Sequence, residues 1–161
     1  MDNLNYFTLA RAVHVVGVVL WIGGVAFVTT VLIPSLREID ESKNRLEQFE
    51  KLELKFAFQA RIVTLITGLS GFYMLHIMNA WNRYLYIQYW WVHLMTMIWF
   101  LFTVVLFILE PLFLHHWFHK KATTNSGQAF LWLQRLHRIL LSASLLAVFA
   151  AVAGAHGLNF I

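Results

Sequence analysis

Residues 7–33 read FTLARAVHVVGVVLWIGGVAFVTTVLI, an unbroken apolar stretch with one charged side chain, Arg11. A helix needs about 20 apolar residues to cross a bilayer, so this stretch alone predicts a membrane-spanning helix. Three similar runs follow, and because they are continuous rather than alternating, helices are favoured over the strands of a membrane barrel. The sequence therefore predicts a single all-α domain, residues 1–161, folded as an up-and-down bundle of four transmembrane helices: Phe7–Ile33, Phe58–Met78, Tyr89–Leu114 and Ile139–Leu158.

The composition of the whole chain is typical of a membrane protein. Of its 161 residues, 60% are hydrophobic and 12% are charged, and the mean hydropathy is +0.65. Soluble domains are about 45–50% apolar and about 25% charged, so water-soluble enzymes and disordered chains are disfavoured. Cysteine is absent, which excludes disulfides and thiolate metal sites. The net charge of +4 does not indicate a nucleic-acid partner, because the basic residues lie beside the hydrophobic runs.

The polar segment at residues 34–57 predicts an amphipathic cytoplasmic helix that leads into the second span. Pro34 is expected to end the first span, and Ser35 with Glu38 has the spacing of a capping box that starts a new helix. Apolar residues of this segment then fall near one helical face. They are Leu36, Ile39, Leu46, Phe49 and Phe56.

Lysine and arginine are concentrated in two connections, residues 34–57 and residues 115–136, the second of which contains a polar turn at Ala122–Gln128. The short link at residues 79–88 carries only Arg83. Because positively charged loops stay in the cytoplasm, both termini are expected on the periplasmic side of a bacterial inner membrane. The first span lacks the features of a cleaved signal peptide and is expected to be retained.

Each span carries one histidine near its outer end, namely His14, His76, His93 and His156. Ionisable residues inside membranes usually face the bundle interior and mark function, and imidazole is a common ligand of haem iron, copper and zinc. We therefore predict a metal or cofactor site in this layer, with a belt of interfacial histidines as the alternative. Further histidines follow the third span and predict an interfacial cap: His115, His116 and His119, with Trp117 and Lys120.

Haem is the favoured occupant of the histidine layer, and copper is the competitor. Gly17 and Gly154 lie close in sequence to His14 and His156, where missing side chains would make room for a flat macrocycle. Arg11 and Arg83 would pair with haem propionates, unless they only anchor the helix ends at the membrane interface. Met97 and Phe100 lie on the same helical face as His93 and would form an apolar wall beside a haem. Copper would instead be favoured by the methionines near the layer, Met74, Met78, Met95 and Met97.

Parts of three helices resemble a known group of proteins. The stretch His14-Val-Val-Gly-Val-Val-Leu-Trp-Ile-Gly-Gly24 resembles the first helix of the copper-resistance D (CopD) group and of the HemJ-type protoporphyrinogen oxidases, which are small four-helix membrane proteins. Trp90-Trp-Val-His93-Leu is similar to the HemJ-type segment in which a lysine occupies the position of His93. The second helix is similar in its Thr64, Thr67, Gly68 and Gly71. The resemblance implies haem b with His14 as a ligand, and the histidine at position 93 suits a bis-histidine haem better than protoporphyrinogen oxidation.

Two functions are consistent with these residues. The first is a b-type cytochrome that acts in electron transfer or as a haem-dependent oxidoreductase. Its axial ligands would be His14 and His93 from diagonal helices, with His76 and His156 as a second pair for another haem or a copper ion. Membrane lipid and a quinone or quinol are its expected partners, and a homo-oligomer is left open. The second function is copper binding or transport; a HemJ-like oxidase activity is a further alternative. A separate polar site is expected near Arg61, His137 and Arg138, with anchoring of the helices as its alternative.

Overall fold

The structure is a computed structural model that describes residues 3–39 and 42–157, and within these ranges it contains helices and no strand. The side chains of residues 3, 42, 43, 45, 113–117, 119, 122 and 123 fall outside the description, so the expected cap of His115, His116, His119 and Trp117 is not described. The elements in chain order are α1 (Asn3–Phe27), the π-helix η1 (Val28–Leu32), α2 (Ile33–Arg37), α3 (Ser42–Ile77), the 3-10 turns η2 (Ala80–Leu85) and η3 (Ile87–Tyr89), α4 (Trp90–Val104), the π-helix η4 (Val105–Leu114) and α5 (His115–Ala155).

These elements form four helical segments that are long and apolar enough to cross a membrane. The expected all-α bundle is therefore confirmed, although each segment extends beyond its apolar run at one end or both. The expected last residue of the fourth span, Leu158, lies outside the described residues. The segments are Leu4–Arg37, Leu46–Ile77, Ile87–Leu112 and Thr124–Ala155.

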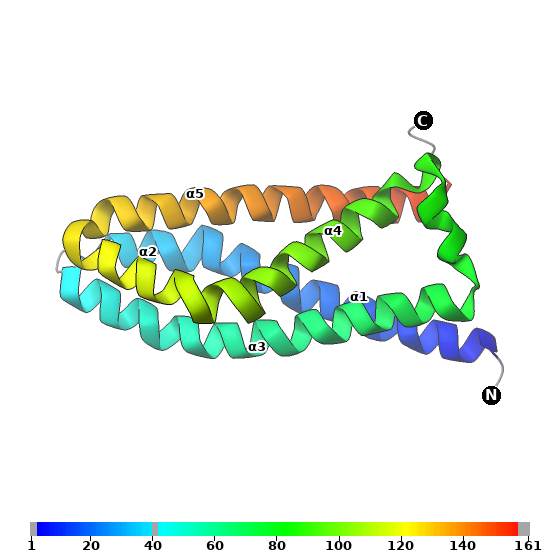
Figure 1. Ribbon diagram of the computed structural model, residues 1–161, viewed down its shortest axis with the longest axis horizontal. Helices are drawn as coiled ribbons and strands as arrows, with labels where there is room; N and C mark the ends of the chain where they lie inside the picture. Colours follow the sequence, from blue (N-terminus) through cyan, green and yellow to red (C-terminus); the bar gives the residue numbers. More distant parts are fainter. Residues whose placement is uncertain (1–2, 40–41, 158–161) are drawn as a thin grey trace.

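The helices run up and down, with α1 alongside α3 and α4 alongside α5 (Figure 1). The beginning of α1, the turns η2 and η3 and the end of α5 share one end of the bundle, which we call the terminus end. The helix α2, the beginning of α3 and the beginning of α5 form the opposite end, which we call the turn end. The four histidines of the predicted layer lie toward the terminus end.

The first span does not end at Pro34, so that prediction is wrong. The helix continues to Arg37, and Ser35 lies inside it rather than capping a new helix. Proline has no N–H and its ring clashes with the preceding turn of an α-helix. The chain accommodates Pro34 with the π turns of η1, where the Ile33 N–H donates to the Val28 carbonyl five residues back. Pro34 then occupies the first turn of α2, a position that tolerates proline.

The predicted amphipathic helix exists, and it continues into the second span as one long helix, α3. Its residues Leu46 and Phe49 are buried and Phe56 is partly buried, as predicted. Leu36 lies in α2 and Ile39 precedes α3, so these two residues of the predicted face do not belong to this helix. Phe49 packs against Phe118 and Phe130 of α5, with ring centroids 5.0 and 5.4 Å apart. This aromatic cluster closes the turn end of the bundle.

The predicted polar turn at Ala122–Gln128 is confirmed. The chain reverses direction at Asn125, where the two helices that α5 combines meet (Figure 1). Asn125 has φ −149° and ψ 82°. Its side-chain Oδ1 accepts a hydrogen bond of 3.1 Å from the N–H of Gln128. An asparagine that bonds the N–H three residues later caps the start of a helix. The long arm of α5 therefore begins at Asn125, earlier than the apolar run alone indicates.

Large apolar side chains cover the outside of the bundle. Phe58, Leu69 and Ile139 are each about two thirds exposed, at 66%, 68% and 67%. Extended apolar surface of this kind is costly in water and suited to lipid. Together with the four long helices, it identifies a multi-pass membrane protein.

Candidate functional site

His14 lies between α1 and α3, half-buried, with its imidazole against the backbone of α3. Its Nδ1 is 2.8 Å from the carbonyl oxygen of Thr67 and 3.4 Å from the hydroxyl of Ser70. A carbonyl oxygen only accepts, so Nδ1 carries the proton and donates it. A neutral imidazole in this tautomer has its lone pair on Nε2, the arrangement that protein histidines adopt when Nε2 binds a metal.

Gly71 provides the space for this imidazole. A Cβ atom at Gly71 would stand 3.1 Å from Cε1 of His14, which is tighter than ordinary contact. Gly71, one of the residues of the second helix on which the family resemblance depends, therefore has a direct structural role beside the histidine. It lets the ring lie close to the helix backbone that orients it.

His93 is exposed on α4 and faces the link between α3 and α4. Its Nε2 is 3.0 Å from the carbonyl oxygen of Tyr84, and its Nδ1 is 3.3 Å from the carbonyl oxygen of Tyr89. A neutral imidazole donates from one nitrogen only, and the shorter contact assigns the proton to Nε2, which is then not free to bind iron in this rotamer. Among the described contacts none joins His93 to His14, so the structure does not assemble the predicted pair across the core.

The other two histidines of the layer are exposed. His156 donates from Nδ1 to the carbonyl oxygen of Val152, at 2.7 Å, which leaves its Nε2 with a lone pair. His76 lies in the last turn of α3. No group of three or more histidine, aspartate or glutamate side chains, among those the structure describes, is placed to hold one metal ion.

The glycines that were expected to make room for a macrocycle face protein side chains instead. A Cβ atom at Gly17 would collide with the hydroxyl of Thr67, and one at Gly154 would stand 2.7 Å from the indole of Trp91. Gly68 receives the indole of Trp99 in the same way, and that indole N–H donates to the carbonyl oxygen of Thr64 at 2.9 Å. The expectation is wrong because these positions bring helices and tryptophans close together.

The remaining predicted residues lie on the surface of the terminus end. Met97 and Phe100 are 61% and 62% exposed and share the outward face of α4 with His93, so the predicted apolar wall would lie on the outside of the bundle. The guanidinium of Arg11 lies 5.8 Å from the ring centre of Phe7, and that of Arg83 lies 5.4 Å from the ring centre of Tyr89. Both contacts are cation–π interactions, which leave the guanidinium N–H groups available to a carboxylate.

A polar site that the sequence analysis only partly anticipated lies toward the turn end. Arg61 of α3 forms an ion pair with Glu110 of η4, with Nη2 2.8 Å from Oε2. Its Nε also donates to the carbonyl oxygen of Leu106, at 2.9 Å. In a π turn that carbonyl would be paired with the N–H of residue 111, which is proline and has none. Arg61 thus takes the place of the missing donor, whereas Arg138, its expected companion, is exposed.

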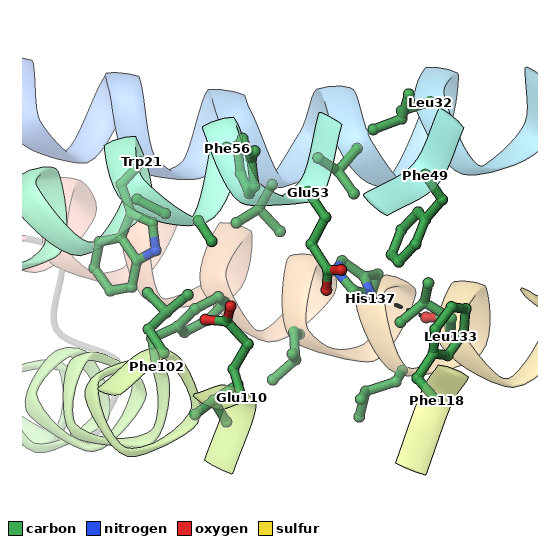
Figure 2. Close-up of a pocket in the computed structure, with 18 of the residues that line it drawn as sticks. Trp21, Leu32, Phe49, Glu53, Phe56, Phe102, Glu110, Phe118, Leu133 and His137 are labelled. Atoms are coloured by element: carbon green, nitrogen blue, oxygen red, sulfur yellow. Dashed lines mark hydrogen bonds between the residues drawn. The ribbon is translucent and has the colours of Figure 1, made fainter. Parts of the chain in front are cut away.

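Beside this ion pair is a cavity of about 130 Å³ (Figure 2). Glu53 of α3, Glu110 of η4 and His137 of α5 line it, and aromatic rings form much of the rest of its wall. His137 donates from Nδ1 to the carbonyl oxygen of Leu133, at 3.0 Å. Sequence reasoning included His137 and Arg61 but missed Glu53 and Glu110. The acidic residue directly before Pro111, inside an apolar run, is the signal that could have identified this site.

Trp21 of α1 completes the cavity and has an unusual environment. Its indole is only 6% exposed, and its N–H has no hydrogen-bond partner among the residues that the structure describes. Figure 2 shows the nitrogen on the side of the ring that faces the cavity. A buried donor without a partner costs about 1–3 kcal/mol, so this N–H marks a position where an acceptor is missing.

Comparisons with known proteins identify no relative of this chain: no family model, curated protein or solved structure matches it.

Proposed function

We propose that this protein is a membrane-embedded haem b protein that takes part in electron transfer, with His14 as an axial ligand. The observation that carries the proposal is the orientation of His14, whose Nδ1–H is fixed by the Thr67 carbonyl at 2.8 Å. Fixing one ring nitrogen by a backbone acceptor leaves Nε2 as the ligand atom and strengthens it as a base. A half-buried histidine in a membrane span is also costly without a function.

The other residues of the layer support the proposal to different degrees. His156 has the same tautomer as His14 and an exposed ring, whereas His93 must rotate away from the Tyr84 carbonyl before it can bind iron. His93 is exposed, so such a rotation needs no repacking of the core. Arg11 and Arg83 lie at the same end of the bundle and would hold the propionate groups. When bound, haem supplies one-electron redox chemistry, and the chain supplies ligands, burial and counter-charges.

The visible absorption spectrum of the purified protein tests this function. We expect a Soret band in the unmodified protein and its loss, or a change to a high-spin spectrum, in His14→Ala. His93→Ala has the same expected effect if His93 is the opposite ligand, and His76→Ala with His156→Ala shows whether a second centre exists. A colourless protein that retains copper would overturn the haem proposal and favour the copper-handling alternative.

A fusion of the chain to a topology reporter tests the orientation. We propose that the terminus end faces the periplasm of a bacterial inner membrane, because Lys and Arg are concentrated in the connections at the turn end. A reporter fused after Ile161 that works only in the periplasm should then be active. Activity of a reporter that works only in the cytoplasm would reverse the orientation. A quinone or quinol that diffuses in the membrane is the electron partner we propose for the haem.

A further inference from the structure

The cavity at the turn end has the size and the walls of a site for one aromatic ring. Its volume is about 130 Å³. An engineered apolar cavity of about 150 Å³ is known to hold one benzene molecule. Phe56, Phe102 and Trp132 contribute to a wall that is mostly apolar. Aromatic rings pack favourably against one another in edge-to-face or offset arrangements, so the wall suits a flat ring better than a branched chain.

The polar atoms of the cavity define what the ring must carry. The N–H of Trp21 needs an acceptor, and it is directed into the cavity (Figure 2). The carboxylates of Glu53 and Glu110 line the same cavity and accept hydrogen bonds. A hydroxyl group both accepts and donates, so a single phenolic O–H can serve the indole and a carboxylate together.

The charges around the cavity favour an uncharged ligand. Of the two carboxylates, Glu110 already has a cation as its partner, Arg61 at 2.8 Å. An anion would lie beside two carboxylates and be repelled. A neutral ring with a hydroxyl group avoids this repulsion, and it is soluble in the lipid that surrounds the bundle.

We propose that this cavity binds a phenol or hydroquinone ring, whose hydroxyl oxygen accepts from the Trp21 N–H and whose O–H donates to Glu53 or Glu110. The ring is that of a lipid-soluble hydroquinone with a tail or of a free phenol, which share this chemistry. The proposal rests on the cavity and its side chains, so it stands whether or not haem occupies the histidine layer. If both are present, the site places an electron-donating ring within the same bundle as the cofactor.

Calorimetric titration of the full-length protein in detergent tests the site, with phenol, a short-tailed benzohydroquinone and its dimethyl ether as probes. We expect the hydroquinone to bind saturably and the dimethyl ether, which has no O–H to donate, to bind at least about tenfold more weakly. Preference for the tailed hydroquinone over phenol would identify the membrane-borne source; equal binding per ring would identify the free phenol.

Two variants and one control locate the binding. Trp21→Phe keeps a ring but removes the N–H, and should weaken hydroquinone binding about tenfold. Ala60→Leu adds bulk to a buried wall residue of the cavity and should abolish binding. Trp81→Phe changes an exposed indole in the link near the terminus end and should leave binding unchanged. Helix content measured by circular dichroism shows that each variant is folded.

The proposal fails if none of the probes binds at millimolar concentration, in which case water alone occupies the cavity. It also fails if Trp21→Phe binds the hydroquinone as tightly as the unmodified protein. The Soret band of each variant is measured in parallel. Normal haem content with lost hydroquinone binding, or the reverse, separates this site from the proposed haem site.

Discussion

The two ends of the bundle are held together in different ways. At the terminus end, tryptophans fill spaces left by glycines, and the imidazoles bond to backbone carbonyls. At the turn end, an ion pair, a proline-containing π-helix and a cavity with two carboxylates lie next to one another. The terminus end is held together by close packing of side chains, and the turn end by the pairing of charged groups. The turn end, with its polar groups and its cavity, is suited to exchange a small ligand.

Removing the cation of the turn end should have the largest effect. In Arg61→Leu the carboxylate of Glu110 is left without its partner, and the Leu106 carbonyl loses its donor. Breaking a fully buried pair costs about 3–5 kcal/mol. Because this pair is partly buried, with side chains 32% and 15% exposed, the free energy of unfolding in mixed detergent micelles should fall by about 3 kcal/mol, the lower end of that range. The double variant Arg61→Leu/Glu110→Leu should recover a large part of the loss. If the double variant is as unstable as the single one, charge balance is not what holds this end.

Adding one methyl group at the terminus end should have the next largest effect. In Gly68→Ala the new Cβ atom collides with the indole of Trp99, which must move and lose its 2.9 Å hydrogen bond to the Thr64 carbonyl. Overpacking of this kind costs about 1–3 kcal/mol, measurable as a lower thermal midpoint. Gly23→Ala is the matched control, since nothing lies within 4 Å of the added atom. Equal midpoints for the two variants would contradict the shape argument.

At the terminus end, the sequence predicted the membrane spans but not the side-chain contacts of the histidines. Hydrophobic runs identified the spans, because crossing a bilayer imposes a length and an apolar composition that leave few alternatives. Depth along the helix axis placed four histidines in one layer. It did not determine their side-chain directions, and His14 faces α3 whereas His93 faces the Tyr84 carbonyl. Those directions depend on how the helices pack, which a single sequence does not contain.

Removing the cap at the bend of α5 should have a moderate effect. Asn125→Ala loses the hydrogen bond from the Gln128 N–H at 3.1 Å, and loss of such a cap costs about 1 kcal/mol. The free energy of unfolding should fall by that amount, and Asn125→Asp should retain most of the stability because its carboxylate also accepts. Full stability in Asn125→Ala would show that the bend is fixed by packing around Phe130 alone.

The smallest effect is expected for an exposed ion pair of the same end. Lys51 lies 2.7 Å from Glu47 on the surface of α3. Solvent-exposed pairs at this spacing contribute about 0.3–0.5 kcal/mol, so Lys51→Ala should change the unfolding midpoint only slightly. The loss of stability in Lys51→Ala is to be compared with the loss in Arg61→Leu. A loss comparable to that of Arg61→Leu would mean that burial does not distinguish the two pairs.

Sequence reasoning identified the basic residues of the turn-end site but missed its acidic residues. Arg61 and His137 were placed at the same depth by counting along the spans, but Arg61 pairs with Glu110 rather than lying beside Arg138. The missing information was the π-helix around Pro111, which changes the direction of Glu110 and frees the Leu106 carbonyl. Helical periodicity assumes 3.6 residues per turn throughout, and it fails where the turn widens.

The π-helix η1 has a consequence for how chains of this kind can be compared. A π turn holds about one residue more than an α turn. Five residues of a π-helix turn through about as much as four residues of an α-helix, so the extra residue is absorbed and the residues after it keep their direction. A homologous chain shorter by one residue within Val28–Leu32 would form a plain α-helix there and still present the equivalent side chains to the turn end. An alignment that forbids gaps inside helices would then match Leu36 and its neighbours to the wrong positions, so a single-residue gap belongs in this part of the first span.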